Sequence, residues 1–196
     1  MNGGIVGKTI TVRSGIWSIN DLLTNPLGLI CNVPSQATIW DSLNNGTGRG
    51  ATSLTTSGNT TNYKEGGSGL NIIKTLKDVN TMESYRDGYS PALNLTGKRL
   101  GVLYYVKDTT ALEKLFAVCL RAGNNPQNWF GCYHLGSTAG IHTGWQRLEG
   151  SVDSPQETTG SPVKTAIDFN TLFVITNNIT DTLAEGDLVF DAIYYY

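Results

Sequence analysis

Residues 188–196 read Leu-Val-Phe-Asp-Ala-Ile-Tyr-Tyr-Tyr, and this stretch decides the fold class. Successive side chains of a β-strand point to opposite faces of a sheet, so Leu188 and Phe190 share one face and Val189 lies on the other. Aromatic and β-branched residues fill both faces, and Asp191 is the single charge. Because a strand that is apolar on both faces has to be covered on both faces, we expect it to close a β-sandwich.

The composition of the whole chain favours one all-β domain. Of the 196 residues, 39% are hydrophobic, which is enough for a core, and the many Gly, Asn, Thr and Ser residues favour turns and strands over helices. The formal net charge of -2 and the lack of a run of basic residues argue against a nucleic-acid partner. No apolar stretch approaches the roughly 20 residues of a membrane helix, so we expect no membrane partner.

The N-terminus indicates assembly in a cytoplasm, and the cysteines are interpreted with that compartment in mind. Residues 1–4 have neither the charged region nor the apolar region of a signal peptide. Cys31, Cys119 and Cys132 lack the spacing of a zinc site, and the last two lie in apolar runs that predict burial. A disulfide between Cys119 and Cys132 is an alternative, although a reducing compartment argues against it.

The chain divides into two regions with different patterning. Residues 1–34 alternate weakly, with one short helical start at Ser18, and predict an extended N-terminal arm. From residue 35 to 196, short apolar runs between turn residues predict about eight or nine strands, which form a jelly-roll β-sandwich. Residues 111–114 predict one helical turn. The expected strands lie at residues 38–43, 70–76, 100–106, 115–121, 129–135, 145–152, 172–176 and 188–196, with 51–57 and 82–86 as weaker candidates.

Four motifs follow one another in the sandwich region. They are YKEGGSGLNI (residues 63–72), PALNLTGKRL (91–100), TGWQRL (143–148) and FDAIYY (190–195). In this order they resemble the galactose-binding-like jelly roll of carbohydrate-binding modules, over residues 36–196. The resemblance implies a non-catalytic β-sandwich of a kind that binds glycans.

Asp191 is the residue of the closing strand that most needs an explanation, because an unpaired charge in an apolar strand is costly. The resemblance implies a structural calcium ion held by Asp191 and by an acid of an early strand, a position that Glu65 matches. A carboxylate that accepts hydrogen bonds from the backbone, an Arg or a Tyr is the alternative. We expect no other cofactor.

A second resemblance concerns the arm. GGIVG (residues 3–7) followed by SGIWSIND (residues 14–21) is similar to a segment that recurs in tailed-phage virion proteins. The resemblance implies a phage or prophage source. An exposed apolar patch needs a partner surface, so we expect the arm to dock to other virion proteins. The candidate docking residues are Ile16, Trp17, Ile19 and Leu22.

No group of residues predicts a catalytic centre. Cys132 and His134 lie two apart, so they share a face of an expected strand, which is the default for strand neighbours rather than the mark of a nucleophile pair. A glycoside hydrolase needs two carboxylates about 5–10 Å apart in a cleft, and no acid here stands in a recognisable catalytic context. We therefore expect no enzymatic activity and no catalytic or metal-binding residues.

One stretch combines the residue types of a sugar-binding site. Such sites stack sugar rings on aromatic side chains and bind hydroxyl groups with Asn, Gln and Arg. Packing of the aromatic rings in the core is the alternative. The candidate ligand-binding residues are Arg121, Asn124, Asn128, Trp129 and Tyr133.

Together these features favour a non-enzymatic structural protein of a phage virion, assembled in the host cytoplasm as a homo-oligomer such as a trimer. The arm would dock to the particle and the jelly roll would face outward. A tail-fibre or baseplate component that binds a host surface glycan is the first hypothesis. A capsid decoration (cement) protein that stabilises the head is the alternative, and a glycan hydrolase is a disfavoured third.

Overall fold

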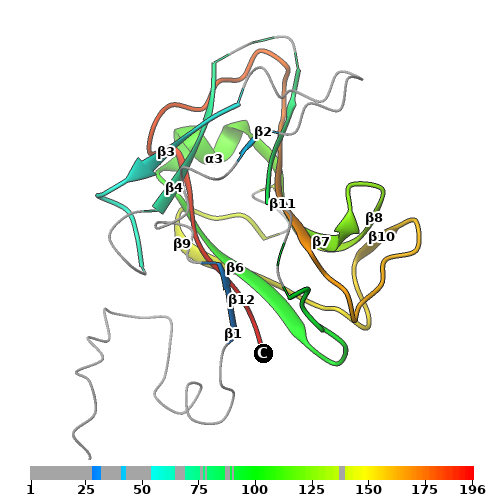
Figure 1. Ribbon diagram of the computed structural model, residues 1–196. Coiled ribbons are helices and arrows are strands. Elements are labelled where there is room, and N and C mark those ends of the chain that lie inside the picture. Colours follow the sequence, from blue (N-terminus) through cyan, green and yellow to red (C-terminus); the bar gives the residue numbers. More distant parts are fainter. Residues whose placement is uncertain are drawn as a thin grey trace, which may run out of the picture.

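The computed structural model describes residues 28–31, 41–42, 54–64, 69–75, 77, 79–86, 89, 91–136 and 140–196. These residues form two antiparallel six-stranded sheets and one short helix (Figure 1). The all-β jelly-roll sandwich expected from the sequence is therefore confirmed. No helix in this part of the chain is long and apolar enough to cross a membrane.

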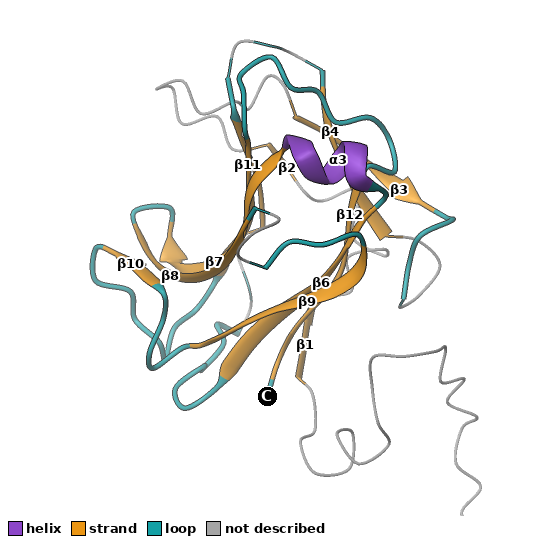
Figure 2. Cartoon of the chain, turned by 180° about the vertical axis from the view of Figure 1, so that it is seen from behind, coloured by secondary structure: helices purple, strands orange, loops and turns teal. Residues whose placement is uncertain are grey.

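The chain crosses between the two sheets several times, so each sheet contains strands from both halves of the sequence. Sheet A contains β1 (Gly28–Cys31), β3 (Leu54–Asn59), β4 (Gly69–Lys74), β6 (Arg99–Val106), β9 (Gly144–Ser151) and β12 (Leu188–Tyr195), in the spatial order β3-β4-β12-β6-β9 with β1 also paired to β12. Sheet B contains β2 (Asp41–Ser42), β5 (Thr81–Arg86), β7 (Leu115–Asn125), β8 (Asn128–Leu135), β10 (Glu157–Thr159) and β11 (Phe169–Thr176), in the order β10-β8-β7-β11-β5-β2. Figure 2 shows β10, β8 and β7 side by side at one edge of sheet B.

The core lies between the inner faces of the sheets. Val118 and Leu120 of β7 share one buried cluster with Tyr104 of β6 and Phe190 of β12. Two smaller apolar clusters lie outside this core. One contains Leu103, Ala192 and Tyr194 of sheet A, and the other contains Ala117, Cys119 and Phe173 of sheet B.

Strand β12 lies inside sheet A and has partners on both edges. β6 pairs along one edge. On the other edge, β4 pairs at Val189 and Phe190, and β1 follows it, with Gly28 opposite Tyr195. The expected closing strand is therefore a central strand of its sheet.

Strand β1 belongs to the part of the chain that the sequence analysis assigned to the arm, and it is hydrogen-bonded into sheet A. The predicted boundary at residues 34–35 lies outside the described residues. The same holds for Glu65 and for the docking residues Ile16, Trp17, Ile19 and Leu22.

Asp191 sits at a β-bulge. The register between β12 and β6 shifts between Asp191 and Ile193, and Ala192 has a φ of 30°. The Asp191 carboxylate accepts a hydrogen bond from the backbone N–H of Ala192 (2.8 Å) and another from the backbone N–H of Lys64. Backbone hydrogen bonding, one of the two explanations for this acid, is therefore present. The structural calcium ion expected near Asp191 and Glu65 stays a prediction.

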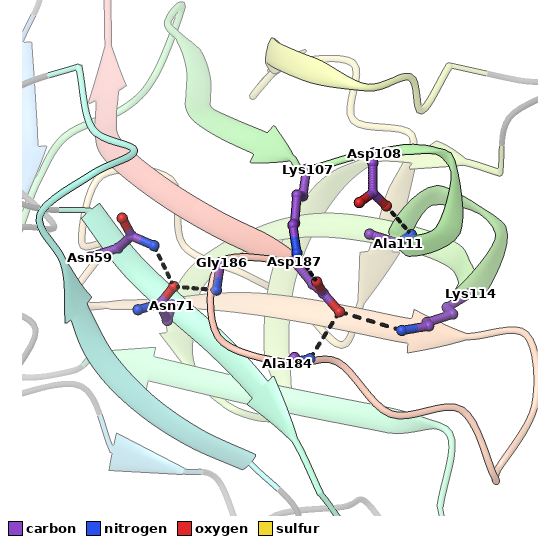
Figure 3. Close-up of polar contacts among 9 residues, drawn as sticks. All are labelled: Asn59, Asn71, Lys107, Asp108, Ala111, Lys114, Ala184, Gly186 and Asp187. Carbon is purple, nitrogen blue, oxygen red and sulfur yellow. Dashed lines mark hydrogen bonds and ion pairs between the residues drawn. The ribbon is translucent and has the colours of Figure 1, made fainter.

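A polar network fastens the turn that leads into β12 (Figure 3). Asp187 pairs with Nζ of Lys114 (3.4 Å) and with Nζ of Lys107 (3.8 Å). On β4, the side-chain oxygen of Asn71 accepts a hydrogen bond from the backbone N–H of Gly186 (3.0 Å). Because these groups satisfy one another, we interpret the network as a support for β12 rather than as a ligand site.

The single helix of the described residues, α3 (Thr109–Lys114), contains the predicted helical turn. Asp108 caps it, with its carboxylate accepting a hydrogen bond from the backbone N–H of Ala111 (2.9 Å). The chain becomes extended at Leu115, where β7 begins. The helix therefore ends before the apolar run of the strand, as expected.

Cys119 and Cys132 are free thiols. Cys119 packs with Phe173 outside sheet B, whereas Cys132 lies in the core, so the two side chains point to opposite faces. Burial raises the pKa of each thiol to about 12, so both stay protonated at neutral pH. The interpretation of both cysteines as small buried hydrophobic residues is confirmed.

Candidate ligand-binding face

The candidate site is the outer face of sheet B, which points away from sheet A. Since Val118 and Leu120 point into the core, the residues that alternate with them point outward. The cross-strand register extends this assignment to the neighbouring strands. The described side chains of this face include Glu83, Ala117, Cys119, Arg121, Trp129, Tyr133, Leu135, Glu157, Phe173 and Ile175.

Arg121 is the centre of this face. Its guanidinium lies over the ring of Trp129, with the carbon 4.1 Å from the centroid, and over the ring of Phe173, at 3.8 Å. It also pairs with the carboxylate of Glu83 (Nη1 to Oε1, 3.1 Å) and with that of Glu157 (Nη2 to Oε2, 3.7 Å). Arg121 and Glu83 are buried, so the charges neutralise each other inside the face.

This arrangement limits what Arg121 and Trp129 can offer a ligand. Trp129 is only 6% exposed, and the guanidinium covers one face of its ring. The structure places both residues on one surface. Their contacts hold the surface together, and their predicted contact with a ligand stays a prediction.

Tyr133 is the more accessible aromatic residue of the face. Its half-buried ring packs against the cluster of Ala117, Cys119 and Phe173. Leu135, on the same strand, is 37% exposed. An aromatic ring that rests on an apolar base and still meets solvent is the feature on which a sugar ring stacks.

The two predicted asparagines lie at the turn between β7 and β8. The side-chain oxygen of Asn124 accepts a hydrogen bond from the backbone N–H of Val163 (3.1 Å). That of Asn128 accepts one from the backbone N–H of Ser161 (2.8 Å). Both oxygens therefore tie the turn to the loop that precedes β11, and a role toward ligand hydroxyls is likewise untested.

Three residues of the face were missed by the sequence analysis. Phe173 and Glu83 belong to expected strands, but the sequence does not tell which strands lie beside β7. Glu157 lies in a stretch that was expected to be loop and that forms β10 against β8. The apolar run around Phe173 marks it as a strand residue, and no signal in the sequence links it to Arg121.

The outer face of sheet A also carries aromatic rings. Trp145 is half-buried beside Tyr105, with 5.5 Å between ring centroids, and Nζ of Lys64 lies 5.5 Å from the Trp145 ring. The hydroxyl of Tyr194 donates to Oε1 of Glu149 (2.7 Å), and its ring lies where Gly101 has no side chain. The hydroxyl of Tyr194 is thus used inside this face, whereas the aromatic residues predicted to bind a ligand, Trp129 and Tyr133, lie on the outer face of sheet B.

The described residues contain no group of three or more His, Cys, Asp and Glu side chains that could hold a metal ion. His134 has a structural partner, since its Nδ1 lies 2.8 Å from the hydroxyl of Tyr104. Because Cys132 keeps its proton, the neighbouring Cys132 and His134 do not form an activated thiolate pair.

Two solved structures are similar in fold. One is a family 30 carbohydrate-binding module, at 10% identity and a TM-score of 0.51, with 76% of this chain and 79% of that chain covered. The other is the family 30 carbohydrate-binding module of a cellulosomal cellulase of Clostridium thermocellum, at 12% identity and a TM-score of 0.51, with 81% and 91% covered. No family model and no curated protein matches the sequence. At this identity the similarity shows the fold alone, a β-sandwich like that of carbohydrate-binding modules, and for the fold the expected resemblance is confirmed.

Proposed function

We propose that the protein is a non-enzymatic structural component of a tailed-phage virion, in the tail fibre or baseplate, and that the outer face of sheet B binds glycans of the host surface. The observation that carries the glycan part is the half-buried ring of Tyr133 on its apolar base. The likeness in fold to two carbohydrate-binding modules supports it.

The chemistry of the face suits a hydroxyl-rich ligand. Tyr133 supplies a ring for stacking, and the carboxylate of Glu157, with its side chain 41% exposed, lies close enough to the face to accept hydrogen bonds. Arg121 holds Trp129 and Phe173 in fixed positions, so little side-chain entropy is lost when a ligand binds. A preorganised surface of this kind binds with useful affinity even through a small contact area.

A glycan array tests this part of the proposal. The probes are lipopolysaccharides, capsular polysaccharides and peptidoglycan fragments from bacteria. We expect binding by the natural protein and a loss of about fivefold to thirtyfold in Tyr133→Ala, because stacking on one ring contributes about 1–2 kcal/mol.

Tyr105→Ala is the matched control. Tyr105 is also a half-buried tyrosine of a central strand, but its ring lies on the outer face of sheet A. Equal losses in both variants, or no binding by the natural protein, would contradict a glycan site on sheet B.

The virion part of the proposal rests on the N-terminal motif and on the apolar residues Ile16, Trp17, Ile19 and Leu22. Because β1 begins at Gly28 and pairs with β12, a deletion of residues 1–27 leaves the described sheets complete. We expect this variant to fold and to be absent from assembled particles, as measured by thermal melting and by mass spectrometry of purified virions. Particles that incorporate the shortened protein normally would refute the docking role. If the particles that lack the protein have less stable heads, that result would favour capsid decoration over a place in the tail.

A further inference from the structure

His134 joins the two sheets from the strand that also carries Tyr133. Its side chain lies on the inner face of sheet B, opposite Val118 in the register of β7 and β8. Its Nδ1 lies 2.8 Å from the hydroxyl oxygen of Tyr104 on β6, and the two rings are 5.9 Å apart. Tyr104 is fully buried, so its hydroxyl depends on this partner inside the protein.

Leu135, at the end of β8, pairs with Gly140 in a single parallel bridge. β10 pairs with β8 only at residues 129–131. Beyond that point, the backbone N–H of Tyr133 donates to a side-chain oxygen of Gln156 (2.7 Å), a residue outside the strands. Tyr133 and His134 are consecutive and point to opposite faces. A displacement of the backbone at His134 would therefore also displace Tyr133.

We propose that protonation of His134 loosens the end of β8 and weakens ligand binding by the outer face of sheet B, so that the face releases its ligand in acid. The inference rests on the function proposed above. A neutral imidazole with its proton on Nε2 accepts the Tyr104 hydroxyl at Nδ1. The protonated ring carries hydrogens on both nitrogens, so Nδ1 can only donate to the Tyr104 oxygen, and the buried hydroxyl hydrogen loses its acceptor.

The surroundings oppose the charged form of His134. Burial lowers the pKa of His134, and the neighbouring His142 lowers it further. The pKa of Tyr104 is raised by its burial, and the pKa values of Cys119 and Cys132 are raised to about 12, so all three stay neutral and supply no counter-charge.

The sign of the effect follows from this lowered pKa. His134 contributes stability that is fully present above the ordinary histidine pKa of about 6.5 and is lost as the pH falls through the lower folded-state pKa. One proton shifts the unfolding equilibrium by at most about tenfold per pH unit in that range.

The test measures binding to the same glycan array at pH 7.5, 6.5 and 5.5 for the natural protein and for the variants His134→Gln and His142→Gln. A glutamine carbonyl can accept the Tyr104 hydroxyl and does not titrate, so we expect His134→Gln to bind equally at all three values. We expect the natural protein to lose affinity as the pH falls to the lowest value, because the protonated fraction of His134 rises. In His142→Gln the loss should persist and begin at a higher pH, because a charge that opposes protonation is gone. An equal acid loss in His134→Gln and the natural protein would overturn the proposal.

Melting temperatures at the same pH values, without ligand, separate this inference from the proposed function. If no glycan binds at pH 7.5, the proposed function fails, and the melting curves then test the contact alone. We expect the natural protein to lose more thermal stability in acid than His134→Gln does, and parallel curves would refute a pH-sensitive contact. Tyr104→Phe, which removes the hydroxyl and keeps the ring, replaces His134→Gln if that variant does not fold.

Discussion

Replacing Arg121 by methionine tests whether the guanidinium is part of the architecture of the outer face of sheet B. The change keeps an unbranched side chain between Trp129 and Phe173 and removes the charge. Glu83, whose side chain is 4% exposed, then loses an ion pair of 3.1 Å. Glu157 also loses its partner, but its side chain is 41% exposed and can be hydrated.

The expected loss of stability is about 3 kcal/mol. Removing one partner of a buried ion pair costs about 3–5 kcal/mol, and the lower end applies because Glu83 keeps other contacts. The two cation–π contacts add about 1 kcal/mol each, and the apolar packing of methionine against the same rings offsets a similar amount. For a domain of this size, about 3 kcal/mol corresponds to a melting temperature lower by about 9 °C.

Thermal unfolding followed by circular dichroism measures this shift, with Arg147→Met as the matched control. Arg147 pairs with Glu149 at 3.2 Å, but its side chain is 39% exposed, so the loss should stay below about 1 kcal/mol. Adding Glu83→Gln to Arg121→Met should restore about 1–2 kcal/mol, since no buried charge then remains. Equal melting temperatures for Arg121→Met and Arg147→Met would refute a structural role for the guanidinium.

Three further predictions follow from the packing. Gly150→Ala should lower the free energy of unfolding in urea by about 2 kcal/mol, because a Cβ there would lie 2.5 Å from Cβ of Cys132. Lys74→Met should cost about 2 kcal/mol and speed amide hydrogen exchange in residues 177–183, because the buried ammonium donates to the carbonyl of Ile179 (2.8 Å). Cys119 and Cys132, each with a pKa of about 12, should resist a thiol reagent at pH 8 and react once urea unfolds the chain; fast labelling of the native protein would contradict their burial.

Much of the fold could be predicted because strand formation leaves a local signal. The apolar runs at residues 100–106 and 129–135 became β6 and β8 with nearly the predicted bounds. The polar stretch around Glu157 was expected to be loop, and it forms β10 because β8 offers it an open edge at residues 129–131. β1 was missed for the same reason, since its pairing depends on β12, which lies far away in the sequence.

In the candidate site, too, the local features could be predicted from the sequence and the contacts between distant strands could not. The mixture of Arg121, Trp129 and Tyr133 could be read from one stretch because β7 and β8 are joined by a short turn, which places these residues on one face. Phe173 and Glu83 could not be predicted as their neighbours, because β11 and β5 meet β7 only through the sheet topology. The sequence therefore indicated the surface, and the structure added which of its side chains hold one another.

Asp191 shows that a charged residue in an apolar strand indicates that a partner exists but does not indicate which group the partner is. A charge within an apolar strand requires a partner, and this requirement was clear from the sequence alone. The partner depends on a bulge, which a pattern of alternating residues does not reveal: the extra residue at Ala192 turns one backbone N–H toward the carboxylate, and Lys64 presents another. Because the bulge occurs where the partner along one edge of β12 changes from β4 to β1, the acid stabilises the backbone at the junction of these three strands. The same holds for His134: its structural role depends on the hydroxyl of Tyr104 on the opposite sheet, and its neighbours in the chain do not reveal that contact.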